Sequence, residues 1–504
     1  MPQHPYANAT HPSATPTPQP RFALNTNPCY ATNAPQTQLE RFAMMTRPLA
    51  TALLATALLA AACLSGCNDS RSGAFDDSDT GADDGDSLDA SSGDAATDAL
   101  VPVPSTPWPS GAGGLAVLFP ADIEPLAQVG QALDMGLRSD GTRVLVVGDN
   151  SSDPGDEMNF VGRVTVFTQA PGETQWVEEA SLRPSDPSQQ LSMAVSVAYE
   201  DDVVVAGAVD FPGDPGRVYV FERIDGEWRE SARIESPPTS DEGADNFGSA
   251  IDINNGRIAV SAASRGSQVG DDIVWILERT NGEWEPAAVL RSPDNGGDAF
   301  GRSLSLDGDR IAIGDNTFGG TLGGEVIAAH GVAYVFDRRD DGAWILSGRL
   351  TPANAQDYDA MGRSISLRGD MLAVGAPGSW GINLTGTVRI FEFEGGEWSE
   401  TASFTGSATD LHHEFGAAVA LDPPNLLVGA LLEENGARAT GGAYLFSLDD
   451  GEWSERVHWQ PPTDETQQGF GYRVALLGDT AAIASTSDDS GAQSGGAIFV
   501  ATRP

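Results

Sequence analysis

Seven in-phase copies of one sequence unit, a tryptophan that keeps its phase in six of them, and four predicted strands per copy predict the fold class. We expect an all-β protein whose residues 113–504 form a seven-bladed β-propeller of four-stranded antiparallel blades. The clearest copy reads DAFGRSLSLDGDRIAIGD at 298–315 and continues after a loop as GVAYVFDRRDDGAW at 331–344. A glycine after an aromatic or aliphatic residue recurs at a period of roughly 53 to 64 residues, at Gly130, Gly248, Gly301, Gly362, Gly416 and Gly471, with Ala194 in the second copy.

Each copy divides into four strands of different character. The first follows the Phe-Gly pair and alternates in polarity, as at 303–306, and a tight turn leads to an apolar second strand, as at 311–313. Continuous apolar strands are typical of strands buried on both faces, which a blade between two blades requires. A longer loop leads to the third strand, and a turn with the sequence Gly-x-Trp in most copies opens the fourth. The in-phase tryptophans are Trp176, Trp228, Trp284, Trp344, Trp398 and Trp453.

The two ends of the repeat array predict how the ring closes. The seventh copy stops after the strand at 496–500 and lacks a fourth strand, whereas residues 114–120 look like a fourth strand with no unit before it. We therefore expect the N-terminal strand to complete the last blade and to leave no open sheet edge.

The segment 44–66 has the features of a lipoprotein signal peptide. Arg47 precedes an apolar run at 49–64 that is too short for a comfortable membrane span. The sequence Leu64-Ser65-Gly66-Cys67 resembles the bacterial lipobox, whose cysteine is acylated and becomes the first residue after cleavage. Cys67 is therefore the predicted lipidation site, and two or three acyl chains would anchor the protein stably. The alternative is an ordinary secretory signal with a chance cysteine.

The anchor is expected in the bacterial outer membrane, on either its periplasmic or its outer side. Asn68, which follows the cysteine, is not the aspartate that retains many lipoproteins at the inner membrane. Residues 1–43 are rich in Pro, Thr, Gln and Asn without apolar periodicity, so they are either disordered or precede a true start at Met44 or Met45. Residues 67–112 form an acidic linker that cannot bury enough apolar surface to fold, and we expect it to be flexible.

Charge and cysteine content exclude several classes of function. The formal charge is 28 − 72 = −44, and a surface this acidic repels phosphate backbones, so no nucleic-acid partner is expected. The three cysteines are Cys29, Cys63 and Cys67, and none follows position 67. The folded domain therefore has no disulfide and no thiolate metal site, and packing alone must stabilise it.

The repeat resembles the FG-GAP repeats of the integrin α-chain propeller, which are common in secreted bacterial proteins. Phe-Gly pairs stand at 247–248, 300–301, 415–416 and 470–471, Gly375-Ala376-Pro377 matches the second half of the motif fully, and Gly429-Ala430 matches it partly. The resemblance covers about 390 residues and implies the propeller fold.

One departure from the family concerns calcium. Calcium-binding members carry an Asp-rich loop between the first two strands, whereas these turns are minimal here, at 139–141, 254–256, 307–309 and 422–424. Two or three side-chain oxygens cannot supply the six to eight ligands that calcium takes, so we expect no metal and no cofactor. Acidic clusters elsewhere remain an alternative for calcium, namely Asp149 with Asp153 and Asp156, or Asp271 with Asp272.

No motif indicates catalysis, and we expect no catalytic residues. The histidines of the domain, at His330, His412-His413 and His458, form no spaced metal motif, and no G-x-S-x-G elbow or phosphate loop is present. His412 and His413 are expected to be solvated. Arg368-Gly369-Asp370 spells the tripeptide that certain integrins recognise, but the same turn reads Asp-Gly-Asp at 307–309, so a hairpin turn is favoured.

These observations favour a membrane-anchored, monomeric, extracytoplasmic binding or scaffold protein that presents a propeller to a protein or glycan partner. The alternatives are a propeller hydrolase or lyase acting on an envelope or extracellular polymer, and a structural envelope protein, because fold alone does not choose among functions. The loops between the second and third strands vary in length, at 149–162, 315–331, 376–386 and 430–442. Variable loops on a rigid scaffold are where binding sites are usually built, so we predict the binding face there.

Overall fold

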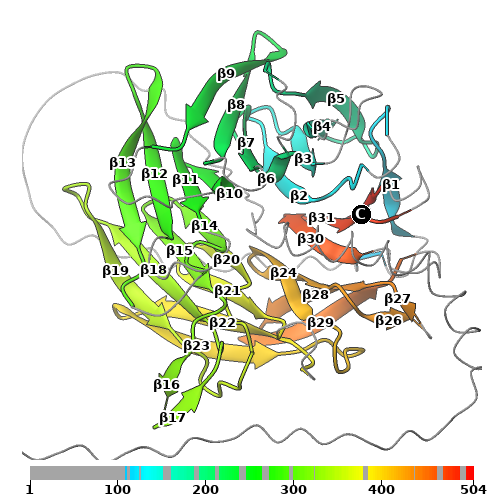
Figure 1. Cartoon of the computed structure of the whole chain (residues 1–504). Helices are drawn as coiled ribbons and strands as arrows, with labels where there is room; N and C mark the ends of the chain where they lie inside the picture. Colours follow the sequence, from blue (N-terminus) through cyan, green and yellow to red (C-terminus); the bar gives the residue numbers. More distant parts are fainter. Residues whose placement is uncertain are drawn as a thin grey trace, which may run out of the picture. The chain divides into compact units, whose positions relative to one another are not determined.

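The computed structural model confirms the all-β, seven-bladed propeller (Figure 1). It describes residues 108–109, 114–123, 127–150, 161–186, 192–209, 215–237, 246–263, 272–294, 299–322, 324–378, 384–435, 438–461, 469–488 and 495–503. The chain divides into two units, residues 1–60 and 61–504, and every described residue belongs to the second.

Each blade is a four-stranded antiparallel sheet in which the strands lie in order from the first to the fourth. Blades one to three consist of β2 (Ala132–Leu137), β3 (Arg143–Asp149), β4 (Arg163–Gln169) and β5 (Val177–Leu182); β6 (Ser192–Glu200), β7 (Val203–Val209), β8 (Arg217–Ile224) and β9 (Glu227–Glu235); and β10 (Phe247–Asn254), β11 (Arg257–Ala262), β12 (Ile273–Thr280) and β13 (Glu283–Arg291). Blades four to six consist of β14 (Ser303–Asp307), β15 (Arg310–Asp315), β18 (Val332–Arg338) and β19 (Trp344–Leu350); β20 (Ser364–Arg368), β21 (Met371–Ala376), β22 (Thr387–Glu394) and β23 (Glu397–Phe404); and β24 (Phe415–Asp422), β25 (Asn425–Ala430), β28 (Gly442–Asp449) and β29 (Glu452–Trp459).

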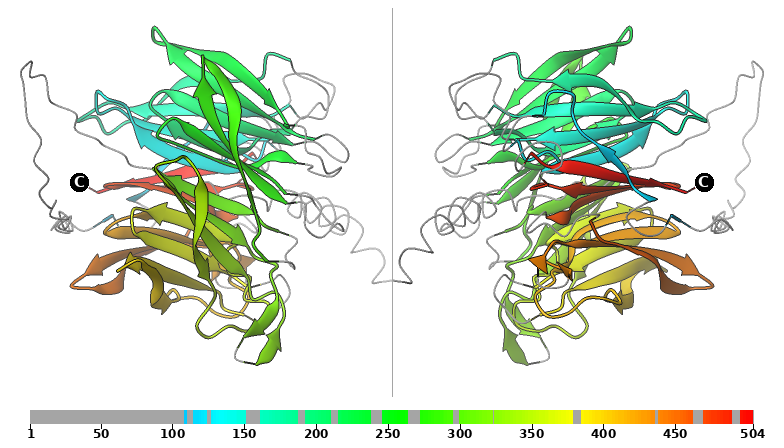
Figure 2. Two further views of the ribbon diagram at one scale, coloured as in Figure 1. Left: turned by 90° about the vertical axis from the view of Figure 1, so that its left-hand side faces the viewer. Right: turned by 90° about the vertical axis from the view of Figure 1, so that its right-hand side faces the viewer.

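Blade seven confirms the predicted closure. It consists of β30 (Phe470–Leu477), β31 (Thr480–Ser485), β32 (Ala497–Thr502) and the N-terminal β1 (Ala116–Leu118). β1 pairs antiparallel with β32, with Ala116 opposite Val500 and Leu118 opposite Ile498. The first strand of each blade contacts the first strand of the next, and β30 contacts β2, so the ring is closed. The C-terminal strands accordingly lie between the first and sixth blades (Figure 2).

The core lies between the sheets, because each blade buries both faces of its inner strands. All of β15 after Arg310 is buried, whereas the outer strand β9 alternates between exposed and half-buried residues. One apolar cluster combines Ala250 and Val274 of blade three with Phe300, Ile313 and other residues of blade four. Packing between neighbouring blades therefore replaces the missing disulfides.

The glycines of the repeat motif are required where one blade rests on the next. Gly362, after Met361, has a φ of 88°, in the left-handed region that favours glycine, and its N–H donates to the Gly375 carbonyl at 3.0 Å. A side chain on Gly375 would clash with the carbonyl oxygen of Gly416 in the next blade. Ser364 instead donates its hydroxyl to that carbonyl at 2.8 Å. Both glycines thus let adjacent backbones touch.

Six of the sequence copies have an in-phase tryptophan, and Trp108 takes the place of the missing one in blade seven. Its ring packs edge-on against Trp459 of blade six at 6.2 Å, and the Trp459 Nε1–H donates to the Pro109 carbonyl at 2.9 Å. The Arg503 guanidinium lies 4.9 Å from the Trp108 ring centroid, as Arg279 lies 5.7 Å from that of Trp284 in blade three. Trp108 precedes the predicted domain boundary at 113 and yet is part of the packed propeller.

Candidate binding face

The propeller has two ends of different construction. At one end lie the tight turns between strands one and two and between strands three and four, which we call the turn face. At the other lie the connections between strands two and three and those between blades, which we call the loop face. Two of the predicted variable loops carry a short hairpin each on the loop face: β16 (Gly320–Leu322) with β17 (Glu325–Ile327), and β26 (Glu434–Asn435) with β27 (Arg438–Ala439).

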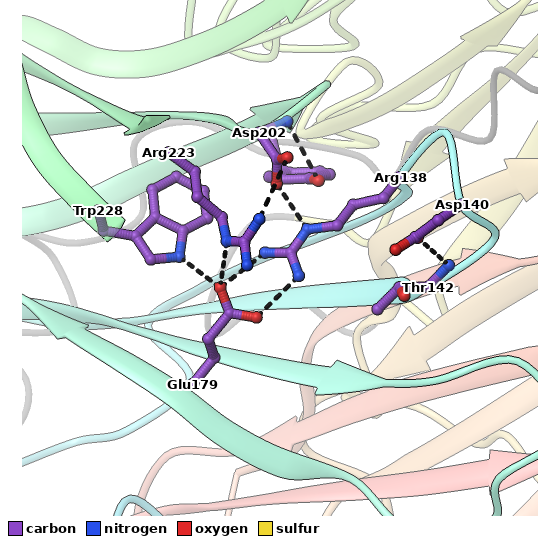
Figure 3. Close-up of polar contacts among 8 residues, drawn as sticks. Arg138, Asp140, Thr142, Glu179, Asp202, Arg223 and Trp228 are labelled. Atoms are coloured by element: carbon purple, nitrogen blue, oxygen red, sulfur yellow. Dashed lines mark hydrogen bonds and ion pairs between the residues drawn. The ribbon is translucent and has the colours of Figure 1, made fainter. Parts of the chain in front are cut away.

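An ion-pair network joins blades one and two at the turn face. Figure 3 shows the Glu179 carboxylate facing the guanidinium groups of Arg138 and Arg223 and the indole of Trp228. Arg138 Nη1 and Nη2 donate to Glu179 at 2.7 and 2.8 Å, and Arg138 Nε donates to Asp202 at 2.5 Å. Arg223 Nε and Trp228 Nε1 donate to Glu179 Oε1 at 2.8 and 2.9 Å. The network therefore fastens the outer strand of blade one to blade two.

The same network shifts the proton affinities of its members. Burial alone would raise the pKa of Glu179, but hydrogen bonds from Arg138 and Trp228 outweigh burial and lower the pKa below its usual value of 4.5. Burial alone would likewise lower the pKa of Arg138, but its bonds to Glu179 and Asp202 raise it. Glu179 and Arg138 therefore both stay charged at neutral pH.

Further arginines fasten other blades in the same way and account for the Arg-Gly-Asp tripeptide. Arg310 of blade four donates to Asp337 of its own blade and to Asp370 in the turn of blade five, both at 2.6 Å. Asp307 accepts the Gly369 N–H at 2.6 Å, and Arg368 Nη1 donates to the Leu367 carbonyl at 2.9 Å. The tripeptide is thus a hairpin turn within the repeat, and its exposed aspartate forms an ion pair with Arg310 of the neighbouring blade.

On the loop face, the base of the β16–β17 hairpin is built around His330. His330 is fully buried, its Nδ1 lies 2.7 Å from the Gly331 carbonyl oxygen, and its ring packs edge-on against Phe318 at 5.5 Å. Burial lowers the pKa of His330, so it is neutral in the folded protein at neutral pH. The Arg349 guanidinium lies 5.1 Å from the Phe318 ring centroid. The hairpin therefore stands on a packed base.

The second hairpin is held through Glu433, which is 1% exposed. Glu433 Oε1 lies 2.7 Å from His458 Nε2 and accepts from Gln460 Nε2 at 2.9 Å, while Oε2 accepts the Tyr444 hydroxyl. The Tyr444 and His458 rings stack at 4.2 Å, and burial, with the bond to Glu433, raises the pKa of Tyr444. Both carboxylate oxygens are occupied, so this cluster holds the loop in place and offers no open acid or base.

The Glu433 cluster is one of three related arrangements that were not predicted from the sequence. Tyr219 donates to Asp186 at 3.0 Å and Tyr334 donates to Asp294 at 2.8 Å. The residue opposite each tyrosine on the fourth strand contacts the same carboxylate, namely Arg233, Arg349 and His458 for Tyr219, Tyr334 and Tyr444. A tyrosine and a basic residue recur at paired positions in alternate copies, and this recurrence is the signal that could have found them.

Backbone hydrogen bonds link successive loop-face connections from blade four to blade seven. Tyr358 N–H donates to the Ala328 carbonyl at 2.7 Å, and Gly378 N–H donates to that of Asp359 at 3.0 Å. The next links, described by donor and acceptor, are His412 N–H to Leu384 O at 2.9 Å, Leu432 N–H to His413 O at 3.2 Å and Phe470 N–H to Thr440 O at 3.1 Å. The loops therefore brace one another.

The structure describes only some of the sequence-predicted site residues. Cys67, Asp153, Asp156 and Asp271 lie outside the described residues, Asp149 is buried and paired with Arg163 at 3.2 Å, and Asp272 is buried. His412 is exposed as expected, but His413 is buried, and its Nδ1 accepts the Asp410 N–H at 2.9 Å. In the described ranges, no three His, Cys, Asp or Glu side chains are grouped to hold a metal ion.

Comparison with known proteins identifies the repeat. The FG-GAP repeat family matches residues 344–391 and 398–446, and each match starts in a fourth strand and ends in the third strand of the next blade. Among solved structures, Sqt1 of Chaetomium thermophilum bound to the N-terminus of ribosomal protein L10 is similar at a TM-score of 0.41 and 13% identity, over 72% of this chain and 84% of that chain. A structure of Sqt1 from the same organism gives 0.41 and 14% over 76% and 83%. No curated protein matches the sequence. Two stretches of the chain thus match FG-GAP repeats, and they lie within a seven-bladed β-propeller.

Proposed function

We propose that this protein is a lipid-anchored, extracytoplasmic binding protein that presents the loop face of its propeller to a protein or glycan partner. FG-GAP propellers are generally protein-interaction scaffolds. The observation that carries the proposal is the contrast between the two faces. The turn face consists of minimal turns fastened by ion pairs, whereas the loop face carries two hairpins on packed bases. Binding residues commonly lie on loops that a rigid scaffold positions.

The hydrolase or lyase alternative has no comparable support. A general acid or base must reach the substrate within hydrogen-bond distance. The most enzyme-like group in the described residues is Glu433 with Tyr444 and His458, and its own hydrogen bonds close it. Tyr444 and His458 lie on the third and fourth strands of blade six, away from the innermost strand β24.

The anchor rests on the sequence around Cys67. Within the described residues, no helix combines the length and the apolar character that crossing a bilayer requires. Metabolic labelling with a palmitate analogue should mark the wild type, and Cys67→Ala should abolish the label and release the protein in soluble form. Equal labelling of Cys67→Ala would contradict the anchor.

The absence of lysine allows a sharper test of the same site. All 28 residues counted as lysine or arginine are arginines, so the α-amino group is the only amine of the polypeptide. An amine-reactive dye should therefore label the Cys67→Ala variant, and it should not label a protein whose cysteine carries a third, amide-linked acyl chain. Labelling of the wild type together with palmitate incorporation would indicate two chains instead of three.

The role of the loop face is tested by removing the two hairpins while keeping the residues that support them. Replacing 320–327 and 434–439 with short Gly-Ser linkers keeps His330 and Glu433 in place, so we expect the melting temperature to change by no more than a few degrees. This variant should lose capture of the partner from envelope extract. Arg368→Ala with Asp370→Ala on the turn face is the control and should retain capture. Loss in the control and retention in the hairpin variant would assign binding to the turn face.

A further inference from the structure

The loop face displays an apolar patch over blades four to six. Val326 at the β16–β17 hairpin is 83% exposed, Tyr358 between blades four and five is 41% exposed, and Leu411 between blades five and six is 47% exposed. The other large apolar side chains exposed in the described part of the chain lie within the strands of the blades, at Val117, Val177, Ile224, Val289 and Leu346. Exposed large apolar side chains that gather on one face of a protein can mark an interaction surface.

The three side chains belong to one continuous set of braced loops. Tyr358 is hydrogen-bonded to Ala328, two residues after Val326, and Asp359 is hydrogen-bonded to Gly378. A Cβ added at Gly378 would lie 2.9 Å from the Leu384 Cβ, and Leu384 accepts the N–H of the residue after Leu411. The patch is therefore pre-organised, and binding would order few additional groups.

The backbone holds Tyr358 of the patch, and His412 next to Leu411, in an unfavourable conformation. Tyr358 has a φ of 67° and His412 has a φ of 72°, and each lies three residues before the residue that precedes the repeat glycine. A bulky side chain in the left-handed region costs about 1–3 kcal/mol and persists only where the surroundings impose it. Two adjacent blades thus place an exposed aromatic ring and an exposed imidazole at equivalent positions, and each lies on a backbone conformation that lowers stability.

The charge around the patch indicates the kind of partner. The loops at 316–331, 351–361 and 405–414 contain no arginine, and the exposed acidic side chains on their described residues are Glu325, Asp357 and Asp410. The whole chain carries a formal charge of −44. Charge complementarity favours a basic partner, steers its encounter and opposes an acidic one.

Building on the proposed function, we infer that this patch binds a basic polypeptide segment. Apolar side chains of the segment would cover Val326 and Leu411, and its arginine or lysine side chains would pair with Glu325, Asp357 and Asp410. A cation could also lie over the Tyr358 ring, which attracts cations through its negative face. Neither a glycan nor a lipid surface would form comparable ion pairs with Glu325, Asp357 and Asp410.

The test uses the full chain in a non-ionic detergent and a fluorescein-labelled synthetic peptide of alternating arginine and leucine. Fluorescence anisotropy should show binding that weakens at high salt, because the Debye length falls from about 10 Å at about 0.1 M to about 3 Å at about 1 M. Tyr358→Ala with Leu411→Ala should weaken binding by about tenfold or more, the effect expected of losing an apolar anchor. These substitutions leave the charge unchanged, so a non-specific attraction to an acidic protein would not respond to them.

The matched control is Val177→Ala with Ile224→Ala, which removes exposed apolar side chains at the turn-face ends of β5 and β8 and should leave binding unchanged. Equal binding by both double variants and the wild type would overturn the inference. So would equal binding of a peptide with glutamate in place of arginine, or binding of dextran or phosphatidylcholine vesicles but not of the basic peptide. If the hairpin variant still loses partner capture in that case, the proposed function stands and only the partner class is wrong.

Discussion

Glu179 offers a direct measure of how strongly the turn-face network joins blades one and two. Glutamine in its place keeps the shape but removes the charge, and its amide NH2 group would face a guanidinium that donates. Arg138, whose side chain is 8% exposed, would keep only Asp202 as a carboxylate partner. Hydrogen bonds to charged groups contribute about 1.5–3 kcal/mol each, and breaking a buried pair costs about 3–5 kcal/mol. We expect Glu179→Gln to lower the free energy of unfolding by about 3 kcal/mol.

The expected melting shift follows from the size of the domain. An unfolding entropy of about 2 cal/mol/K per residue over roughly 390 residues gives about 0.8 kcal/mol/K, so the melting temperature should fall by about 4 °C. Differential scanning calorimetry at neutral pH measures this shift. Glu227→Gln on the neighbouring blade two, whose partner Arg229 is solvent-exposed, is the control and should melt like the wild type.

The pH dependence separates the charge from the shape of Glu179. The folded state lowers the pKa of Glu179 below 4.5, so its contribution is fully present above that value and is lost as the pH falls through the folded pKa. The difference between wild type and Glu179→Gln should therefore shrink below about pH 4.5. A variant that melts like the wild type at neutral pH, or a difference that persists unchanged in acid, would refute the reasoning.

Three further predictions concern closure and burial. Trp108→Ala should lower the free energy of unfolding by about 3–5 kcal/mol because the ring is buried against Trp459. Val117 is exposed, so Val117→Ala should change the stability measured by calorimetry little. Equal effects of the two substitutions would contradict the docking of Trp108. Deleting residues 101–121 should remove the fourth strand of blade seven and abolish the cooperative melting transition. Deleting residues 68–100 should leave the melting transition unchanged. Identical melting of the two deletion variants would mean that β1 does not close the ring. Burial and the bond to Asp186 raise the pKa of Tyr219 to about 12, so the stabilisation by its neutral hydroxyl is present below about pH 10 and is lost towards pH 12. Ultraviolet titration should show a component near pH 12 that Tyr219→Phe removes, and its survival in that variant would contradict the assignment.

Repetition made the fold predictable from sequence. A missing fourth strand after 496–500 and an extra strand at 114–120 could only be reconciled by pairing the two, and β1 pairs with β32 as predicted. The Phe-Gly and Gly-Ala-Pro positions were recognisable as a motif in the sequence. Why glycine is required there is shown only by the structure, in which Gly375 lies against the carbonyl of Gly416 in the next blade. Contacts between blades join residues about 50 or more positions apart, which periodicity within one copy does not report.

The candidate site was predictable only in outline. Loop length identified 315–331 and 430–442 as variable, and both carry hairpins. The packed bases under them depend on His330 and Glu433, single residues without a repeating counterpart of the same type. Trp108 could not be placed because additional residues separate it from β1, so it falls out of the tryptophan phase. His413 is likewise buried and bonded to the Asp410 N–H, which composition does not reveal.

Hydrogen–deuterium exchange of the full chain, with and without the arginine–leucine peptide, tests the assignment of recognition to the loop face most directly. Binding at the patch should slow exchange in the segments around Val326, Tyr358 and Leu411, and it should leave the turns at 200–203 and 307–310 unchanged. Protection confined to those turns, or spread equally over both faces, would contradict the account.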